Sequence, residues 1–449
     1  MKYHLITLGC QMNMSDSERV RTIIETQTGY QWTDHEDEAN LVGILACSVR
    51  QKAIDKVYSR IQKWNKWKNH KSLITFISGC ILPNDMEKFL KLFDIVFRMS
   101  ELEKLPEMIR HYGVVTPAAL FTDLDGMPGN DSIDSFWKVN PHYSSDYEAF
   151  VPIQNGCDKF CTFCAVPYTR GREVSRPSGE IISEVQRLVE EGYKSLTLLG
   201  QNVNSYGLDK KGEEISFPQL LGAIGEMGIK SGKKFWLYFT SPHPRDMTDE
   251  VIEMVANYDC LAKQIHLPIQ SGDDKVLIKM NRKHTVDRYR QIMDTIRRLI
   301  PQATVFTDII VGFTGETDEA FENTRKIIHE FKYNMAYIAQ YSVRPGATSS
   351  RWADDVPKEV KSTRFHQLSQ DLRMHTAVHN QQMIGQQYTV LVTGSDRKEG
   401  YLSALTEGKI VCRFASDDLS LIGKFVDITI ISSTDFSVEG QMVKQPAGV

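Results

Sequence analysis

Short apolar runs alternate with amphipathic stretches over the first 116 residues of the chain. The runs expected to be strands are Leu5–Leu8, Leu41–Ala46 and Leu73–Ser78. Before the last of them, Ile54, Val57, Ile61 and Trp64 recur at the spacing of one buried helix face. Strands that alternate with helices usually pair in parallel. Residues 1–116 are therefore predicted to form a small parallel α/β domain.

Residues 117–147 lack this periodicity and are rich in Pro, Gly, Asp, Asn and Ser, so they are predicted to be a linker. From residue 148 the alternation of strands and helices resumes. The expected strands are Phe150–Ile153, Ser195–Leu199, Phe235–Phe239, Gln264–Leu267, Val305–Val311 and Met335–Tyr341. Six strands joined by helices predict a partial (βα)6 barrel over residues 148–383, with its active site at the carboxyl ends of the strands.

The pattern changes again near the end of the chain. A long polar helix is expected over residues 357–382, and short alternating strands follow within residues 384–447. The expected strands are Tyr388–Val392, Leu402–Leu405, Ile410–Phe414 and Phe425–Ile431. This pattern favours a small antiparallel barrel of the OB type, which commonly binds oligonucleotides. The chain as a whole is therefore predicted to belong to the α/β class.

Composition narrows the setting. A chain of 449 residues exceeds one core of about 250–300 residues, so two or three domains are expected. No apolar stretch approaches the roughly 20 residues that span a bilayer, and the first ten residues are too polar for a signal peptide. Eight cysteines without such a signal favour metal ligation in the cytoplasm. A net charge of −4 means that any RNA partner must bind local basic patches.

Three cysteines carry the strongest chemical signal. Cys157, Cys161 and Cys164 form a C-x3-C-x2-C triplet, and no fourth cysteine or histidine follows nearby. Three thiolates can bind three irons of a 4Fe–4S cluster and leave the fourth iron open to a small molecule. The triplet resembles the signature of radical S-adenosylmethionine (SAM) enzymes. The alternative is three incidental core cysteines.

A second set of thiols shares a position rather than a spacing. Cys10, Cys47 and Cys80 each follow the end of an expected strand by one or two residues. The carboxyl ends of parallel strands face one crevice, so the three thiols could converge on a second cluster. They could instead be buried structural cysteines. Cys260 and Cys412 have no partner at ligand spacing and are expected to be buried thiols.

Three further residues are candidates for contact with a cofactor. Phe163 lies inside the triplet and could shield a cluster or face the adenine of SAM, or it could simply pack within its loop. Gln201 and Asn202 follow the second barrel strand, where uncharged amides could bind an amino-acid zwitterion or a base edge. The alternative for these two amides is a capped loop.

Two basic segments could contact phosphate. One extends from Arg50 to Lys71 and includes Trp64 and Trp67, so it could follow an RNA backbone or could be a solvated helix face. The other comprises Arg170, Arg172 and Arg176, directly after the triplet, which are the better candidates for phosphate contact.

These motifs together resemble the radical SAM methylthiotransferases along essentially the whole chain. Three blocks carry the resemblance: the first-domain cysteines, the triplet, and the last barrel, which is similar to a TRAM domain. The motifs that agree with the tRNA 2-methylthioadenosine (MiaB-type) branch are Leu8–Asn13, Phe160–Cys164, Val166–Glu173, Leu199–Tyr206 and Leu267–Gly272. The branch that modifies a ribosomal-protein aspartate typically has Pro-Lys-Asn where this chain has Gln11, Met12 and Asn13. Ala46 and Thr314 depart from the family pattern without removing a thiolate.

The resemblance implies a specific reaction. The substrate would be a tRNA carrying N6-isopentenyladenosine beside the anticodon, and the product its 2-methylthio derivative. Two 4Fe–4S clusters would take part: one at Cys157, Cys161 and Cys164 that binds SAM, and one on the first-domain cysteines that holds sulfur. The last barrel would bind the anticodon stem-loop, and a reductant such as flavodoxin or ferredoxin and a sulfur donor would be partners.

Other functions remain open at this stage. Within the family, the alternatives are methylthiolation of threonylcarbamoyladenosine in tRNA or of a ribosomal-protein aspartate. An iron–sulfur electron carrier and an RNA-binding protein with structural clusters are alternatives of other classes.

Overall fold

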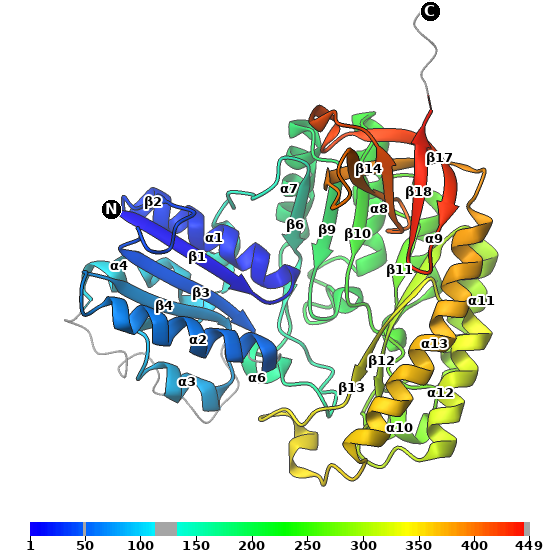
Figure 1. The fold of residues 1–449 in the computed structure, drawn as a ribbon, viewed down its shortest axis with the longest axis horizontal. Coiled ribbons are helices and arrows are strands. Elements are labelled where there is room, and N and C mark those ends of the chain that lie inside the picture. The colour runs from blue at the N-terminus through cyan, green and yellow to red at the C-terminus, as the bar shows by residue number, and fades with distance from the viewer. Residues whose placement is uncertain (48–50, 113–132, 444–449) are drawn as a thin grey trace, which may run out of the picture.

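The computed structural model describes residues 1–449 except 48–50, 113–132 and 444–449. The first domain is a five-stranded parallel sheet in the order β2-β1-β3-β4-β5 (Figure 1). Its strands are β1 (Lys2–Leu8), β2 (Gln31–Trp32), β3 (Leu41–Cys47), β4 (Ile74–Cys80) and β5 (Ile95–Val96). The helices beside it are α1 (Gln11–Gln27), α2 (Gln51–Trp67), α3 (Pro83–Phe89), η1 (Met99–Lys104) and α4 (Leu105–Arg110). The predicted parallel α/β domain is confirmed.

Both faces of this sheet are covered, which explains why its central strand β3 is buried and apolar along its whole length. Along β3, Leu41 and Leu45 join one core with side chains of α1 and α4. Val42 and Ile44 alternate with them and join the other core, with side chains of α2 and α3. The predicted helix face on α2 is fully in place, because Ile54, Val57, Ile61 and Trp64 all belong to this second core.

A short helix follows the residues that lie outside the described part. Residues 113–132, where most of the predicted linker falls, are outside it. Helix α5 (Ile133–Lys138) lies within the predicted linker, yet it buries Ile133, Phe136 and Trp137 against the core shared with α1. This part of the segment therefore belongs structurally to the first domain.

The central domain contains the six expected strands in two parallel three-stranded sheets, β6-β9-β10 and β11-β12-β13. The strands are β6 (Glu148–Pro152), β9 (Ser195–Leu199), β10 (Trp236–Phe239), β11 (Gln264–His266), β12 (Thr304–Val311) and β13 (Met335–Gln340). A parallel bridge from Leu237 to Leu261 connects the sheets. The helices outside them are α7 (Ser178–Glu191), α8 (Phe217–Ser231), α9 (Asp249–Asn257), α11 (Val286–Leu299) and α12 (Asp318–Phe331). Strands and helices share one core.

The long helix α13 (Lys358–Gln382) leads to a closed five-stranded barrel (Figure 1). Its strands are β14 (Gln387–Ser395), β15 (Tyr401–Thr406), β16 (Val411–Ala415), β17 (Phe425–Ser433) and β18 (Ser437–Met442). Four were expected. β18 was missed because Ser437–Met442 is mostly polar and contains a glycine. It closes the barrel by pairing in parallel with β16 and antiparallel with β17.

The C-terminal barrel is fixed to the central domain. Phe306 of β12 is buried in the same core as Val390 and Phe414 of the barrel. The side chain of Thr304 donates a hydrogen bond of 2.7 Å to the Gly408 carbonyl, and Tyr147 donates one of 2.8 Å to the Thr393 carbonyl. Within the described residues, no helix is long and apolar enough to cross a membrane.

Candidate active site

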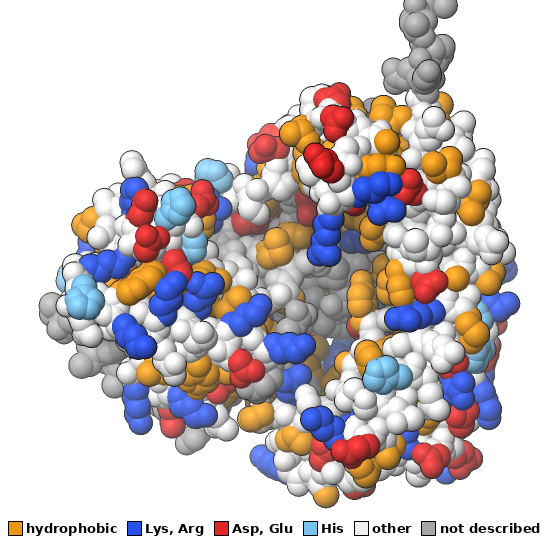
Figure 2. Space-filling view, viewed as in Figure 1, with side chains coloured by type: hydrophobic (Ala, Val, Ile, Leu, Met, Phe, Trp, Pro, Cys, Tyr) orange, Lys and Arg blue, Asp and Glu red, His pale blue; other side chains and the backbone are white. Residues whose placement is uncertain are grey.

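A cavity of about 480 Å³ lies at the carboxyl ends of the central strands. Its walls come from the segments after β9, β10 and β11, and from the start of α1 in the first domain. Figure 2 shows a hollow between the first domain and the rest of the molecule, with lysine and arginine side chains on both sides of it. Cys157, Cys161 and Cys164 line the cavity, and Cys10 lines it from the opposite domain. The cavity therefore lies at the carboxyl ends of the central strands, where the sequence analysis expected the active site.

The triplet is presented by a loop that follows the short strand β7 (Gln154–Asn155). Gly156 begins this loop with a φ of 82°, and a Cβ there would lie 2.0 Å from the carbonyl oxygen of Arg172. Only glycine fits that position. The segment between β11 and α11 of the central domain also holds this loop. The Asn281 side chain donates to the Phe160 carbonyl at 2.9 Å, and Thr162 N donates to the Met280 carbonyl at 3.0 Å.

Two of the triplet thiols, those of Cys157 and Cys161, are buried, and that of Cys164 is half-buried. Burial raises the pKa of Cys157 and of Cys164 to about 12. Their protons would leave on metal binding, because metals bind thiolates. Arg282 donates from Nη1 to Cys161 Sγ at 3.4 Å and from Nη2 to the Pro268 carbonyl at 2.8 Å. Among the described residues, no group of three His, Cys, Asp or Glu side chains is arranged for a single metal ion. A cube of four irons differs from that case, since each thiolate binds a separate iron.

The first-domain cysteines converge as the strand-end argument predicts. Cys47 and Cys80 are register partners at the ends of β3 and β4. A hydrogen bond to Cys47 and burial raise the pKa of the Cys80 thiol, while the nearby Arg170 charge acts in the opposite direction. Asn13, in the first turn of α1, contacts both Cys10 Sγ at 3.6 Å and Cys80 Sγ at 3.9 Å. These three thiols, here called the strand-end triad, therefore lie around one point.

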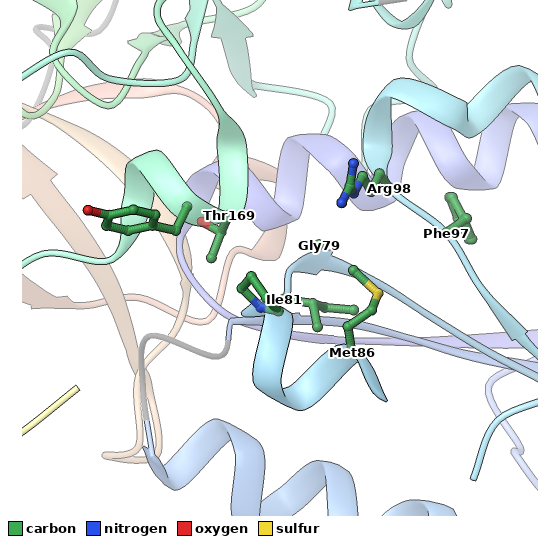
Figure 3. A pocket seen from close by; sticks show the side chains of 8 residues that line it. Gly79, Ile81, Met86, Phe97, Arg98 and Thr169 are labelled. Carbon is green, nitrogen blue, oxygen red and sulfur yellow. The ribbon is translucent and has the colours of Figure 1, made fainter. Parts of the chain in front are cut away.

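A much smaller cavity lies beside this triad. It has a volume of about 10 Å³, and its lining includes Gly79, Ile81, Arg98 and Thr169 (Figure 3). A space of this size holds about one water molecule. This small cavity therefore has no room for an organic cofactor, whereas the cavity of about 480 Å³ has.

Polar atoms without partners mark one wall of the large cavity. Among the described residues, Gln201 Oε1, Asn202 Oδ1 and His243 Nε2 are buried and accept or donate no hydrogen bond. His243 Nδ1 accepts from the Arg245 N–H at 3.1 Å, which places the ring proton on Nε2. Burial lowers the pKa of His243, so the ring is neutral. Two acceptors and one donor facing a cavity suit a ligand with both an ammonium and a carboxylate group.

Phe163 lies within the triplet loop, directly before Cys164, and is half-buried. Its ring packs edge-on against Phe313, with centroids 6.4 Å apart, and it lines the cavity. Phe163 thus packs within the protein and also lines the cavity, and its contact with a cofactor stays a prediction.

The sequence analysis missed several site residues. Lys159 and Asp246 form a buried ion pair of 2.6 Å at the cavity, and Asn202 Nδ2 donates to the same carboxylate at 3.1 Å. Arg282 was also missed. Asp246 lies in the segment after β10 of the central domain. Its position after a strand end could therefore have marked it as a site residue. No spacing rule connects Arg282 with Cys161.

The arginines after the triplet require a correction. Arg170 and Arg176 are buried and bind acidic side chains, Asp16 for the first and Glu180 and Glu184 for the second. They are not available to phosphate. Arg172 is exposed, and its guanidinium binds Asp158 at 2.7 Å. Cys412 is buried as expected, while Cys260 is half-buried beside the central core.

Similar proteins agree with this architecture. Residues 151–328 match the Radical SAM superfamily, residues 2–98 match Uncharacterized protein family UPF0004, and residues 381–443 match the TRAM domain. In fold, the chain resembles a radical S-adenosylmethionine methyltransferase from Kitasatospora setae with a TM-score of 0.58, at 10% identity over 88% of this chain and 79% of that one. That likeness supports the fold alone.

Closer relatives extend over the whole chain. The tRNA-2-methylthio-N(6)-dimethylallyladenosine synthase of Alcanivorax borkumensis is 35% identical over 99% of both chains. The enzyme of that name from Haemophilus ducreyi is 36% identical over 99% of this chain and 92% of its own. The radical SAM superfamily implies SAM and a 4Fe–4S cluster as cofactors. The chain belongs to the tRNA-2-methylthio-N(6)-dimethylallyladenosine synthase family of radical SAM enzymes.

Proposed function

We propose that this protein converts N6-isopentenyladenosine beside the anticodon of tRNA to its 2-methylthio derivative, using SAM and two 4Fe–4S clusters. The observation that carries the proposal is the shared cavity, which Cys10 of the strand-end triad and all three triplet cysteines line together. A single cavity between two sets of three thiols lets one adenine ring meet both sets. An electron carrier needs no such cavity.

The triplet would hold the cluster that binds SAM. Such a cluster, when bound, supplies the one-electron cleavage of SAM. The unpartnered atoms of Gln201, Asn202 and His243 fit the amino and carboxylate groups of SAM. The buried pair of Lys159 and Asp246 fixes Asn202 in place, because its amide donates to Asp246. Phe163 supplies an apolar surface at the same cavity.

The strand-end triad would hold the cluster that carries sulfur. Its thiols come from three separate segments, so this site exists only in the folded first domain. Cys10 is the member of this triad that lines the cavity, so sulfur held there would be supplied from the side of Cys10. The reaction also needs an electron, from a reductant such as flavodoxin or ferredoxin, and a sulfur donor. We place the reaction in the cytoplasm because its substrate is tRNA.

The RNA would be held by exposed cations outside the cavity. On the C-terminal barrel, Arg397 and Lys398 are exposed, and Lys398 Nζ lies 3.6 Å from the centre of the Tyr401 ring. On α2, Lys52, Lys56 and Lys66 are exposed along one face. Cations on both domains suit a substrate that extends across the hollow, since phosphate contacts dominate RNA affinity.

Mass spectrometry of tRNA nucleosides tests the proposal. A strain without this protein should lose 2-methylthio-N6-isopentenyladenosine and accumulate N6-isopentenyladenosine, and the wild-type gene should restore the product. Loss of 2-methylthio-threonylcarbamoyladenosine instead would assign the protein to the other tRNA substrate. Unchanged tRNA with loss of a methylthio group from a ribosomal protein would overturn the tRNA assignment.

A further inference from the structure

Arg170 connects the two halves of the active site at a place that neither substrate nor solvent reaches. It ends the short helix α6 (Val166–Arg170), which begins two residues after Cys164. Its guanidinium points across the domain boundary into the first domain. Nε donates to Cys80 Sγ at 3.0 Å, while Nη2 and Nη1 donate to the Asp16 carboxylate at 2.5 and 3.4 Å.

This contact is buried and is held by further hydrogen bonds. The Arg170 side chain is 5% exposed and that of Asp16 is 0% exposed. Nη1 also donates to Asn155 Oδ1 at 3.3 Å, and the Asn155 amide donates to the Arg170 carbonyl at 3.0 Å. Figure 3 shows Thr169 of α6 beside Gly79 and Ile81, the two neighbours of Cys80. The helix after the triplet is thus packed on the end of β4.

The guanidinium of Arg170 makes two separate contacts: its two Nη atoms bind Asp16, and its Nε binds Cys80. A buried arginine costs several kcal/mol unless it is paired, and Asp16 supplies that pairing. The Nε–H is directed elsewhere, at the sulfur of Cys80. A neutral thiol needs no cation at hydrogen-bonding distance. A thiolate that binds iron is different, since hydrogen bonds to cluster sulfurs help to set the reduction potential.

We infer that Arg170 is a positioning residue that sets the reduction potential of the cluster on the strand-end triad, and that Asp16 limits its effect. The inference rests on the proposed function, because it requires a cluster on Cys10, Cys47 and Cys80. Reduction adds one negative charge to a cluster. The guanidinium favours that added charge and the Asp16 carboxylate opposes it, so the two residues must act with opposite signs.

The test measures the potential of this cluster alone. In the full-length chain, Cys157, Cys161 and Cys164 are replaced by alanine, the protein is reconstituted with iron and sulfide without oxygen, and its potential is titrated by electron paramagnetic resonance. Arg170→Gln should shift the potential to more negative values by at least about tenfold in the reduction equilibrium, or 59 mV for one electron. Asp16→Asn should shift it to more positive values.

Two further variants control the measurement. Arg170→Lys keeps the charge but loses the fixed Nε donor, so it should give a smaller negative shift, and it carries the test if Arg170→Gln assembles no cluster. Arg172→Gln removes an exposed arginine two residues away, which binds Asp158 and lies over the Phe160 ring, and should leave the potential unchanged.

The outcomes separate this inference from the proposed function. A cluster whose potential is unmoved by the Arg170 and Asp16 variants overturns the inference alone. Shifts of one sign in both also overturn it, because they indicate a loosened boundary between domains. If the chain without triplet cysteines binds no iron, the two-cluster function fails, and the inference fails with it.

Discussion

The two cysteine triads, each proposed to bind one cluster, are assembled in opposite ways. The triplet lies within one loop of eight residues, Cys157 to Cys164, and backbone hydrogen bonds and Gly156 give that loop its shape. The strand-end triad draws its members from positions 10, 47 and 80, and parallel strand pairing brings them together. A local sequence motif determines the first site, and the topology of the sheet determines the second. A local site can form early in folding, whereas the second forms only with the whole sheet.

The largest expected effect comes from removing either set of thiols. With both clusters in place, reconstituted protein should carry about eight irons. Alanine at Cys157, Cys161 and Cys164 should remove about half of the iron and abolish formation of 5′-deoxyadenosine from SAM.

The reciprocal variant distinguishes the roles of the two triads. Alanine at Cys10, Cys47 and Cys80 should also remove half of the iron, but dithionite-reduced protein should still cleave SAM and should make no methylthiolated tRNA. Full iron content or surviving product in this second variant would contradict the two-cluster function.

Two matched glycine substitutions change the backbone beside the two triads, one substitution for each triad. Gly156→Ala places a Cβ 2.0 Å from the Arg172 carbonyl oxygen, in the triplet loop. Gly79→Ala places one 2.4 Å from the Ala46 carbonyl oxygen, beside Cys80. Each glycine also has a positive φ, so both variants are strained.

We expect each variant to lose its own cluster and keep the other. Iron analysis and SAM cleavage report which one is lost. Gly29→Ala is a suitable control, since Gly29 has a positive φ of 75° and open space around it. Loss of both clusters in either variant would show that the two sites are not independent.

Glu173 makes the surroundings of the triplet sensitive to pH. Burial raises the pKa of this carboxyl to about 7. The folded protein therefore binds more protons than the unfolded chain between about pH 4.5 and 7, and stability should fall as pH rises through that range. The expected size is a few kcal/mol, at about 1.4 kcal/mol per pKa unit. Glu173→Gln should flatten the dependence of the apoprotein melting temperature between pH 5 and 8. An unchanged slope would be evidence against this assignment.

The smallest expected effect concerns tRNA binding. Deleting residues 384–447 would expose Phe306, which shares the core of the C-terminal barrel, so charge substitutions are the cleaner test of that barrel. Arg397→Gln with Lys398→Gln should weaken tRNA binding, reduce its dependence on salt, and leave SAM cleavage without tRNA unchanged. Lys326→Gln on α12, an exposed cation of the central domain, serves as the control. Equal affinity of the double variant and wild type would remove these two residues from the interface.

Hydrophobic periodicity predicted most of the fold, since β3 and α2 bury the residues that their patterns select. It failed for β18, where Ser437–Met442 gains its strand from pairing with β16 and β17 rather than from its own pattern. Position after a strand end selected Gln201 and Asn202, which line the cavity, and it predicted that Cys10, Cys47 and Cys80 lie at neighbouring strand ends, where the structure has them. Arg170 was selected only as a candidate for phosphate contact, and its partner Cys80, 90 residues away, was missed because no local pattern encodes a contact between domains.

The fixed attachment of the C-terminal barrel has a geometric consequence. Because Phe306 lies in the barrel core and Thr304 binds Gly408, the barrel cannot swing against the central strands. If the C-terminal barrel holds the stem of an RNA hairpin, the distance from the barrel surface to the cavity is fixed. The nucleotide that reaches the cavity would then be chosen by its distance along the RNA as well as by its chemistry. A hairpin with one extra base pair in the stem would present the wrong nucleotide, even though every base of its loop is correct.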